Sequence, residues 1–136
     1  MDMNLPMQPK NQRFHLEGVR HISPREAFEQ LNNNAVLLVD VRDKDEYDVE
    51  RVGLPNVKHY PMTEIVDSLE NLPKAVLLIT MDTLGERGTK VANLLNRQQF
   101  SRVANLDGGI VRWKAENLPV EDILPSACGG CCGCSS

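Results

Sequence analysis

Two groups of residues in this chain of 136 residues carry side chains suited to chemistry, and they lie far apart in the sequence. The first follows an apolar run at residues 75–80 and consists of Asp82, Thr83, Leu84, Gly85, Glu86 and Arg87. The second is a set of four thiols near the C-terminus, namely Cys128, Cys131, Cys132 and Cys134. The first group suits anion binding, and the second suits soft-metal or sulfur chemistry.

The loop of residues 82–87 is expected to form a cradle for an anion. Residues 75–80 predict a central strand, and apolar residues recur at helical spacing after the loop. A strand, a short loop and a helix N-terminus in succession present converging backbone N–H groups and the positive end of the helix dipole. Such a cradle stabilises a negative group without a metal ion.

Asp82 opens this loop, and three interpretations of it are open. A carboxylate turned into the cradle would accept the loop N–H groups and supply the anion itself. Asp82 could instead be a plain cap of the following helix, where Asp is an ordinary residue. It could also be a nucleophile or general base, but the sequence places no partner His beside it. Since Asp82 and Glu86 outnumber Arg87, the loop is formally negative and should repel a doubly charged anion.

The four C-terminal thiols also have three interpretations. Neighbouring glycines would let the backbone fold around a soft ion such as Zn²⁺ or Cu⁺, although zinc sites usually draw their ligands from two separated segments. Exposed neighbouring thiols could instead accept a persulfide from a partner and pass it on. The third interpretation is a terminal segment without a role.

Alternating strands and helices are predicted around the loop. The continuous apolar runs at 35–39 and 75–80 indicate strands that are covered on both faces. Further strands are predicted at 19–22, 57–60 and 103–106, and helices at 24–31, 43–49, 63–72 and 110–116, besides the helix after the loop. Asp43 and Glu46 have the spacing of a capping box. This alternation predicts an α/β fold with a parallel sheet and helices on both faces.

These features resemble the rhodanese-like family of single-domain sulfurtransferases. The resemblance rests on residues 22–26 (Ile-Ser-Pro-Arg-Glu), 38–42 (Leu-Val-Asp-Val-Arg), 46–47 (Glu-Tyr), 106–113 (Leu-Asp-Gly-Gly-Ile-Val-Arg-Trp) and 118–121 (Leu-Pro-Val-Glu). Residues 52–57 depart from the family's usual His-Ile-Pro-Gly-Ala turn. The resemblance implies a three-layer α/β/α fold around a central, mostly parallel five-stranded sheet.

In the family that the chain resembles, a catalytic Cys opens the loop and an Arg closes it, in the pattern C-x-x-x-x-R. Counting back from Arg87 places Asp82 at the position of that Cys. The resemblance therefore implies that the loop has no catalytic residue and that thiosulfate sulfurtransferase activity is absent, because a carboxylate cannot store sulfur as a persulfide. Asp40 and Arg42 form the neighbouring motif.

Two functions from different classes follow. The first is a non-enzymatic rhodanese-like module that acts in regulation or sulfur metabolism. It would bind an unknown protein partner, for example one from a sulfur-transfer pathway, or an unknown ligand. The alternative is a sulfur-relay or soft-metal-binding protein that uses the C-terminal cysteines. The first function needs no cofactor, whereas the second could hold Zn²⁺ or Cu⁺ on the tail.

Composition limits the remaining possibilities. The formal net charge is −4 and the Lys and Arg residues are dispersed, so no nucleic-acid partner is expected. No apolar window is long enough to span a membrane, and the first residues lack the apolar core of a secretory signal, so a cytoplasmic protein without a membrane partner is expected. We expect an N-terminal arm at 1–17 that is loose over residues 1–12, a rhodanese-like domain at 18–122 and a Cys- and Gly-rich tail at 123–136.

Overall fold

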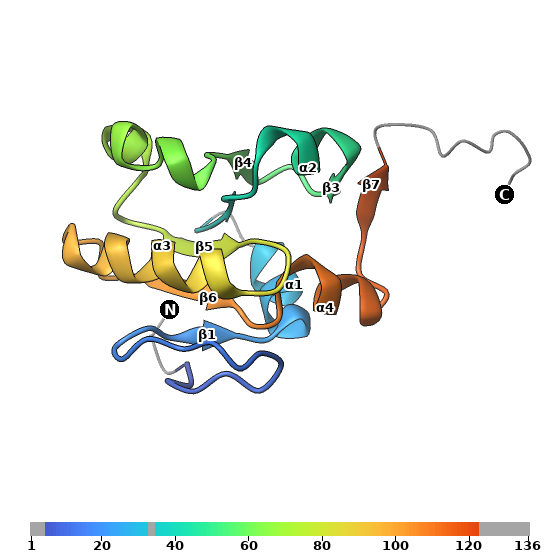
Figure 1. Ribbon diagram of the computed structural model, residues 1–136, viewed down its shortest axis with the longest axis horizontal. Coiled ribbons are helices and arrows are strands. Elements are labelled where there is room, and N and C mark those ends of the chain that lie inside the picture. Colours follow the sequence, from blue (N-terminus) through green and yellow to red (C-terminus); the bar gives the residue numbers. More distant parts are fainter. Residues whose placement is uncertain (1–4, 33–34, 123–136) are drawn as a thin grey trace, which may run out of the picture.

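The sheet that positions the loop is visible in a computed structural model, which describes residues 5–32 and 35–122. Its five strands have the order β1-β6-β5-β2-β4, and all neighbouring strands are parallel. The strands are β1 (His21–Ile22), β2 (Val36–Asp40), β4 (Val57–His59), β5 (Leu77–Met81) and β6 (Val103–Leu106). The strand before the loop, β5, is therefore central, as its apolar sequence predicts (Figure 1).

Helices cover both faces of this sheet, which confirms the predicted α/β fold (Figure 1). One face carries α1 (Pro24–Leu31) and α4 (Gly109–Ala115), and the other carries α3 (Glu86–Arg97). The short helix α2 (Lys44–Val49) follows β2. The sequence patterns did not predict a second, antiparallel pair of strands, β3 (Glu50–Val52), which follows α2, and β7 (Val120–Asp122), which follows α4. The carboxyl ends of β2, β5 and β6 therefore carry the segments that form the candidate site.

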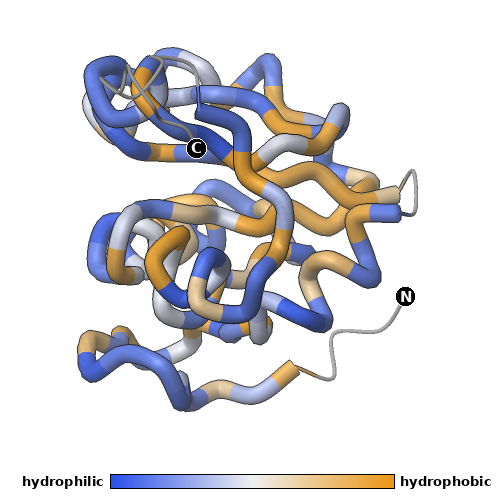
Figure 2. The backbone as a smooth tube through the Cα atoms, turned by 90° about the vertical axis from the view of Figure 1, so that its right-hand side faces the viewer, coloured by the Kyte–Doolittle hydropathy of each residue, from blue (hydrophilic) through white to orange (hydrophobic). Residues whose placement is uncertain are grey.

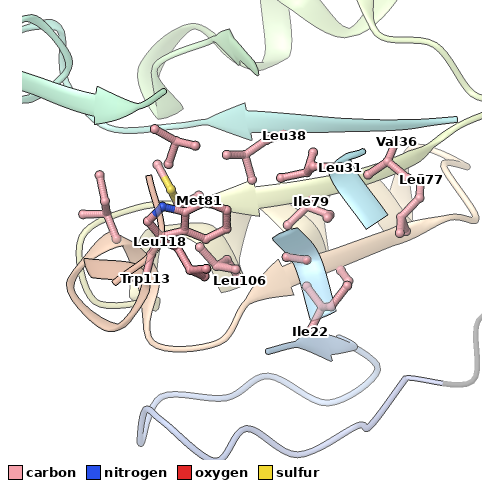
Figure 3. Close-up of a cluster of buried hydrophobic side chains, with 14 residues drawn as sticks. Ile22, Leu31, Val36, Leu38, Leu77, Ile79, Met81, Leu106, Trp113 and Leu118 are labelled. Carbon is pink, nitrogen blue, oxygen red and sulfur yellow. The ribbon is translucent and has the colours of Figure 1, made fainter. Parts of the chain in front are cut away.

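The core consists of two apolar clusters, one on each face of the sheet. In β5, Leu77, Ile79 and Met81 belong to the cluster with α1 and α4, whereas Leu78 belongs to the cluster with α3. Figure 3 shows the first cluster, in which the Trp113 ring lies beside Met81 and Leu118. Burial on both faces explains why the interior strands are coloured as hydrophobic in Figure 2, while hydrophilic residues gather in the outer segments.

The segment predicted as one helix at 63–72 forms two short 3₁₀ helices instead, Met62–Glu64 and Val66–Asn71. The Ser68 N–H donates to the Ile65 carbonyl at 3.0 Å, which is the three-residue spacing of a 3₁₀ helix. Ile65 and Leu72 are nevertheless buried against the α3 layer, as predicted. Over so short a segment, the same apolar positions fit either type of helix, so their spacing did not distinguish the two.

The N-terminal arm was predicted to be loose, and the structure contradicts this for its described part. The backbone N–H groups of Lys10 and Asn11 donate to the carboxylate of Asp107 at 2.7 and 2.9 Å. The His21 N–H donates to the Pro6 carbonyl at 2.9 Å. Lys10 and Asn11 lie about a hundred residues from Asp107, a separation at which local sequence patterns carry no information.

Among the helices of the two described ranges, none is long and apolar enough to cross a membrane.

Candidate functional site

The loop of residues 82–87 lies between the central strand β5 and helix α3. Asp82 directly follows the strand and is only 2% exposed. Its Oδ1 accepts the Gly85 N–H at 2.6 Å, and its Oδ2 accepts the Arg87 N–H at 2.8 Å. The carboxylate therefore faces into the cradle and occupies the N–H groups that an external anion would use. We call Asp82 with the Gly85 and Arg87 amides the loop cradle.

Two of the three interpretations of Asp82 describe the same contact. Gly85 is the N-cap residue of α3 and makes no side-chain cap, and Arg87 is the second residue of the helix. By accepting the Arg87 N–H, Asp82 supplies both the anion of the cradle and the missing cap. The third interpretation, a general base, gains no support, because within the described ranges no His hydrogen-bonds to Asp82.

Burial governs the protonation of Asp82. It raises the pKa of this carboxyl above the ordinary value, while the N–H groups of Arg87 and Gly85 and the Arg87 charge oppose the change. A negative charge in the cradle therefore costs free energy, and the two amides offset only part of that cost. It follows that the cradle depends on both hydrogen bonds being kept.

The cation of the loop, Arg87, is paired with Glu46 of α2. Its Nη1 donates to Glu46 Oε1 at 2.8 Å and its Nη2 to Glu46 Oε2 at 3.1 Å, and Thr83 Oγ1 bonds to both side chains. Arg87 Nε is farther from Asp82 Oδ2, at 3.6 Å. The hydrogen bond from Arg87 is the main reason that the pKa of Glu46 falls to about 2. Arg87 is thus committed to a carboxylate of the protein.

Glu46 had a predicted capping role in α2 and a place in the family resemblance, but no predicted role in the loop. It does cap that helix, since the Asp43 N–H donates to its Oε1 at 3.1 Å. Its pairing with Arg87 was missed, because the two residues are 41 positions apart. The signal that could have found it is topological: β2 and β5 are adjacent and parallel, so the segments after them meet at one edge of the sheet.

Asp40 and Arg42, the predicted neighbouring motif, form a buried ion pair at the end of β2. Arg42 Nη2 donates to Asp40 Oδ2 at 2.8 Å and to the Glu50 carbonyl at 2.7 Å. The Arg42 side chain is 4% exposed and that of Asp40 is fully buried. The pair therefore fixes the chain on both sides of α2, the helix that carries Glu46, and its hydrogen bonds are made within the protein.

Gln12 of the N-terminal arm also contacts the loop, and the sequence patterns did not indicate it. Its Nε2 donates to the Gly85 carbonyl at 3.3 Å and to Thr89 Oγ1 at 2.9 Å, while its Oε1 accepts the Gly108 N–H at 2.9 Å. Gly85 has φ +110, and a side chain there would overlap the Gln12 amide. We call the contacts of Lys10, Asn11 and Gln12 with Asp107 and Gly108 the arm clasp.

The predicted tail site cannot be placed, because Cys128, Cys131, Cys132 and Cys134 lie outside the described residues. Their metal-binding and sulfur-relay interpretations stay predictions. Within residues 5–32 and 35–122, no group of three or more His, Cys, Asp or Glu side chains is placed to hold a metal ion.

Known proteins resemble the chain over most of its length. It is 31% identical over 103 residues to thiosulfate sulfurtransferase GlpE of Coxiella burnetii, covering 76% of this chain and 94% of the relative. A sulfurtransferase of Allochromatium vinosum is 32% identical over 85 residues, which cover 62% and 78% of the two chains. A tRNA uridine(34) hydroxylase of Bacillus pumilus is 28% identical over 115 residues, covering 82% of this chain but only 35% of that protein.

Solved structures agree with these relatives. The rhodanese-like domain of Alr3790 from Anabaena sp. superposes with a TM-score of 0.72 at 24% identity, over 85% of this chain and 89% of that one. The polysulfide-sulfur transferase of Wolinella succinogenes gives a TM-score of 0.66 at 26% identity, over 76% and 79% of the two chains. The fold of the chain is thus shared with these solved α/β domains. The sequence model of the rhodanese-like domain family matches residues 23–116 of this chain. The chain therefore belongs to that family.

Proposed function

We propose that this protein is a rhodanese-like binding module without sulfurtransferase activity, in which Asp82 stands at the position of the catalytic Cys. The observation that carries the proposal is that the Asp82 carboxylate accepts two N–H groups of the loop, at 2.6 and 2.8 Å. Sulfur transfer by this route needs a thiolate that attacks a sulfane sulfur and holds it as a persulfide. A carboxylate in the same cradle excludes the thiolate and cannot replace its chemistry.

The charges around the loop support the same proposal. Glu46 neutralises Arg87, and Asp82 adds a buried negative charge inside the loop cradle. A dianion such as thiosulfate would therefore approach a carboxylate with no unpaired arginine to hold it. The module needs no cofactor at this site.

The setting that we propose is sulfur metabolism in the cytoplasm, with a protein partner from a sulfur-transfer pathway. The names of the Coxiella and Allochromatium relatives support this setting. The proposed organisation keeps an arm at 1–17, the domain at 18–122 and a tail at 123–136. No role for a nucleic acid or a membrane is proposed.

A thiosulfate:cyanide sulfurtransferase assay tests the proposal. The chain is compared with a form in which Cys128, Cys131, Cys132 and Cys134 are all Ser, and with that form carrying Asp82→Cys. We expect only background turnover from the natural chain and from the four-Ser form, since both keep Asp82. The four-Ser form with Asp82→Cys should show increased turnover, because it supplies the missing thiol. Turnover by the four-Ser form with Asp82 intact would overturn the proposal.

The alternative function, sulfur relay or soft-metal binding by the tail, is supported by one fact. The tail holds all four thiols of a chain whose relatives include sulfurtransferases. Activity that requires the cysteines but not a thiol at position 82 would favour it. Titrating free thiols with and without Zn²⁺, Cu⁺ or a polysulfide donor distinguishes relay from metal binding.

A further inference from the structure

A cleft of about 440 Å³ opens beside the loop, between α2 and α4. Its lining includes Val49 of α2, Ile110 and Val111 of α4, and Thr83 of the loop. Val49 is 48% exposed and Val111 is 49% exposed, so two aliphatic side chains at this cleft face solvent. The cleft therefore offers apolar surface beside the candidate site.

This apolar surface continues onto the loop. Thr83 also lines a second hollow of about 340 Å³, together with Leu84, which is 63% exposed. In the described parts of the chain, five large hydrophobic side chains are exposed, and three of them, Val49, Leu84 and Val111, border these two adjoining hollows. Exposed apolar side chains gathered at one place mark an interaction surface more often than isolated ones do.

The border of the cleft is acidic. Residues 43–50, which include α2, contain five carboxylates and one lysine. The two cations that line the cleft are already paired, Arg42 with Asp40 and Lys114 with Glu50 at 3.0 Å. Arg87 of the second hollow is paired with Glu46. Asp43 and Asp45 are exposed, and within the described ranges neither has a Lys, Arg or His nitrogen within 4.0 Å. The border thus has acceptors for added positive charge and no free cation for an anion.

We propose that this cleft binds an extended segment of a protein partner that combines an aliphatic side chain with Lys or Arg. The aliphatic side chain packs between Val49 and Val111, and the cations lie opposite Asp43 and Asp45. Charge complementarity selects this occupant over an acidic one. It also argues against residues 123–136 of the same chain, which contain no Lys or Arg. The inference rests on the proposed binding function and gives the chemistry of the partner.

The test is a titration of the full chain with two labelled peptides, Gly-Lys-Leu-Val-Lys-Gly and its counterpart with Glu in place of Lys. Fluorescence anisotropy measures affinity, and amide NMR shifts locate the contact. We expect saturable binding of the basic peptide, weaker by about tenfold for the acidic one, with shifts at Val49, Leu84 and Val111. Added salt should weaken the basic peptide more than the acidic one.

Matched substitutions locate the surface. Val111→Asp should weaken the basic peptide by about tenfold, and Asp45→Asn by about threefold. Val66→Asp is the control, since Val66 is 61% exposed on the second 3₁₀ helix and does not line the cleft. Circular dichroism of each variant checks that it is folded. Equal loss from Val66→Asp, or shifts confined to other elements, would overturn the inference.

Other occupants give distinct results. A peptide of residues 123–136 that binds the cleft more tightly than the basic peptide would make the tail the occupant. Dimerisation of the chain that Val111→Asp abolishes would make a second copy the occupant. Either result overturns the inference. The sulfurtransferase assay is a separate readout, because turnover refutes the proposed function without affecting the peptide result, and peptide failure refutes the cleft without restoring catalysis.

Discussion

Two aspartates follow adjacent strands of the sheet and make the same kind of contact with different parts of the chain. Asp82 follows β5 and Asp107 follows β6, and they are 2% and 4% exposed. Each carboxylate accepts two backbone N–H groups, at 2.6 and 2.8 Å for Asp82 and at 2.7 and 2.9 Å for Asp107. In the loop cradle the donors are three and five residues away, whereas in the arm clasp they are 97 and 96 residues away.

The same contact, a carboxylate that accepts two backbone N–H groups, thus has a different role in each region. Asp82 binds N–H groups of its own loop, so its hydrogen bonds determine whether those groups are available to an external anion. Asp107 holds a distant segment against the sheet, so its hydrogen bonds determine where the N-terminal arm lies. Gln12 connects the two regions, because it bonds to Gly85 in the loop and to Gly108 after β6.

The largest expected effect is the loss of the Asp82 carboxylate. Asp82→Ala leaves the buried Gly85 N–H and the partly buried Arg87 N–H without acceptors and should lower the free energy of unfolding by about 4 kcal/mol, as measured by urea denaturation. Asp82→Asn is the matched control, because it keeps one acceptor oxygen and should cost less. A loss smaller than that caused by Asp107→Ala would show that the cradle is not the stronger contact.

The second largest expected effect is a loss of stability in acid through His21, which contacts the N-terminal arm. His21 is 1% exposed and bonds to Asn105 and His15, and burial lowers its pKa from 6.5 to about 4. Neutral His21 therefore stabilises the fold above pH 6.5, and this contribution is lost as the pH falls to 4 and the ring must be protonated against its preference. Urea denaturation across this range should show a loss of about 3 kcal/mol.

The contribution of Asp82 to stability changes with acid in the opposite direction. Burial raises the pKa of its carboxyl, so folding favours the protonated form. As the pH falls from 6.5 to 4, the hydrogen-exchange protection of the Lys10 and Asn11 amides, corrected for the intrinsic pH dependence of exchange, should thus decrease before that of Gly85 does. His21→Gln should flatten the pH dependence of stability. If that variant keeps the full slope between pH 6.5 and 4, another group is responsible.

Asp107→Ala tests the arm clasp directly. The freed N–H groups of Lys10 and Asn11 can bind water once the arm moves, so we expect a loss of about 2 kcal/mol, less than for Asp82→Ala. Hydrogen exchange should increase at Lys10 and Asn11 and remain unchanged at Arg87. Equal acceleration at both places would mean that the two regions open as one unit.

Removing the charge of Glu46 should have the smallest effect. Glu46→Gln weakens the ion pair with Arg87, and both side chains are about one-third exposed, so the expected loss in urea denaturation is about 1 kcal/mol. Because the pKa of Glu46 is lowered to about 2, this contribution is present above pH 4.5 and is lost below it. The variant should therefore equal the natural protein in stability near pH 2. A difference that persists there would assign the effect to packing.

Much of the fold was predictable from local patterns. The uninterrupted apolar run before Asp82 indicated a central strand, and β5 is central. The helix predicted at 24–31 forms at those residues, and the Oγ of Ser23 before it accepts the Glu26 N–H at 3.2 Å. The helix predicted at 63–72 was wrong in type, because its apolar spacing suits a 3₁₀ helix equally well. The loop itself was recognisable because the contacts of Asp82 with Gly85 and Arg87 lie within six residues of one another.

What the sequence by itself determined about this protein is the content of the loop: a carboxylate, a glycine and an arginine between a buried strand and a helix. Only the tertiary structure decided that the carboxylate turns inward, that Arg87 is committed to Glu46, and that Gln12 and Asp107 attach the arm. The physical reason is that strand, loop and helix signals depend on neighbours in sequence. These side-chain contacts depend instead on which strands lie side by side in the sheet. The local sequence around a residue does not specify the order of the strands.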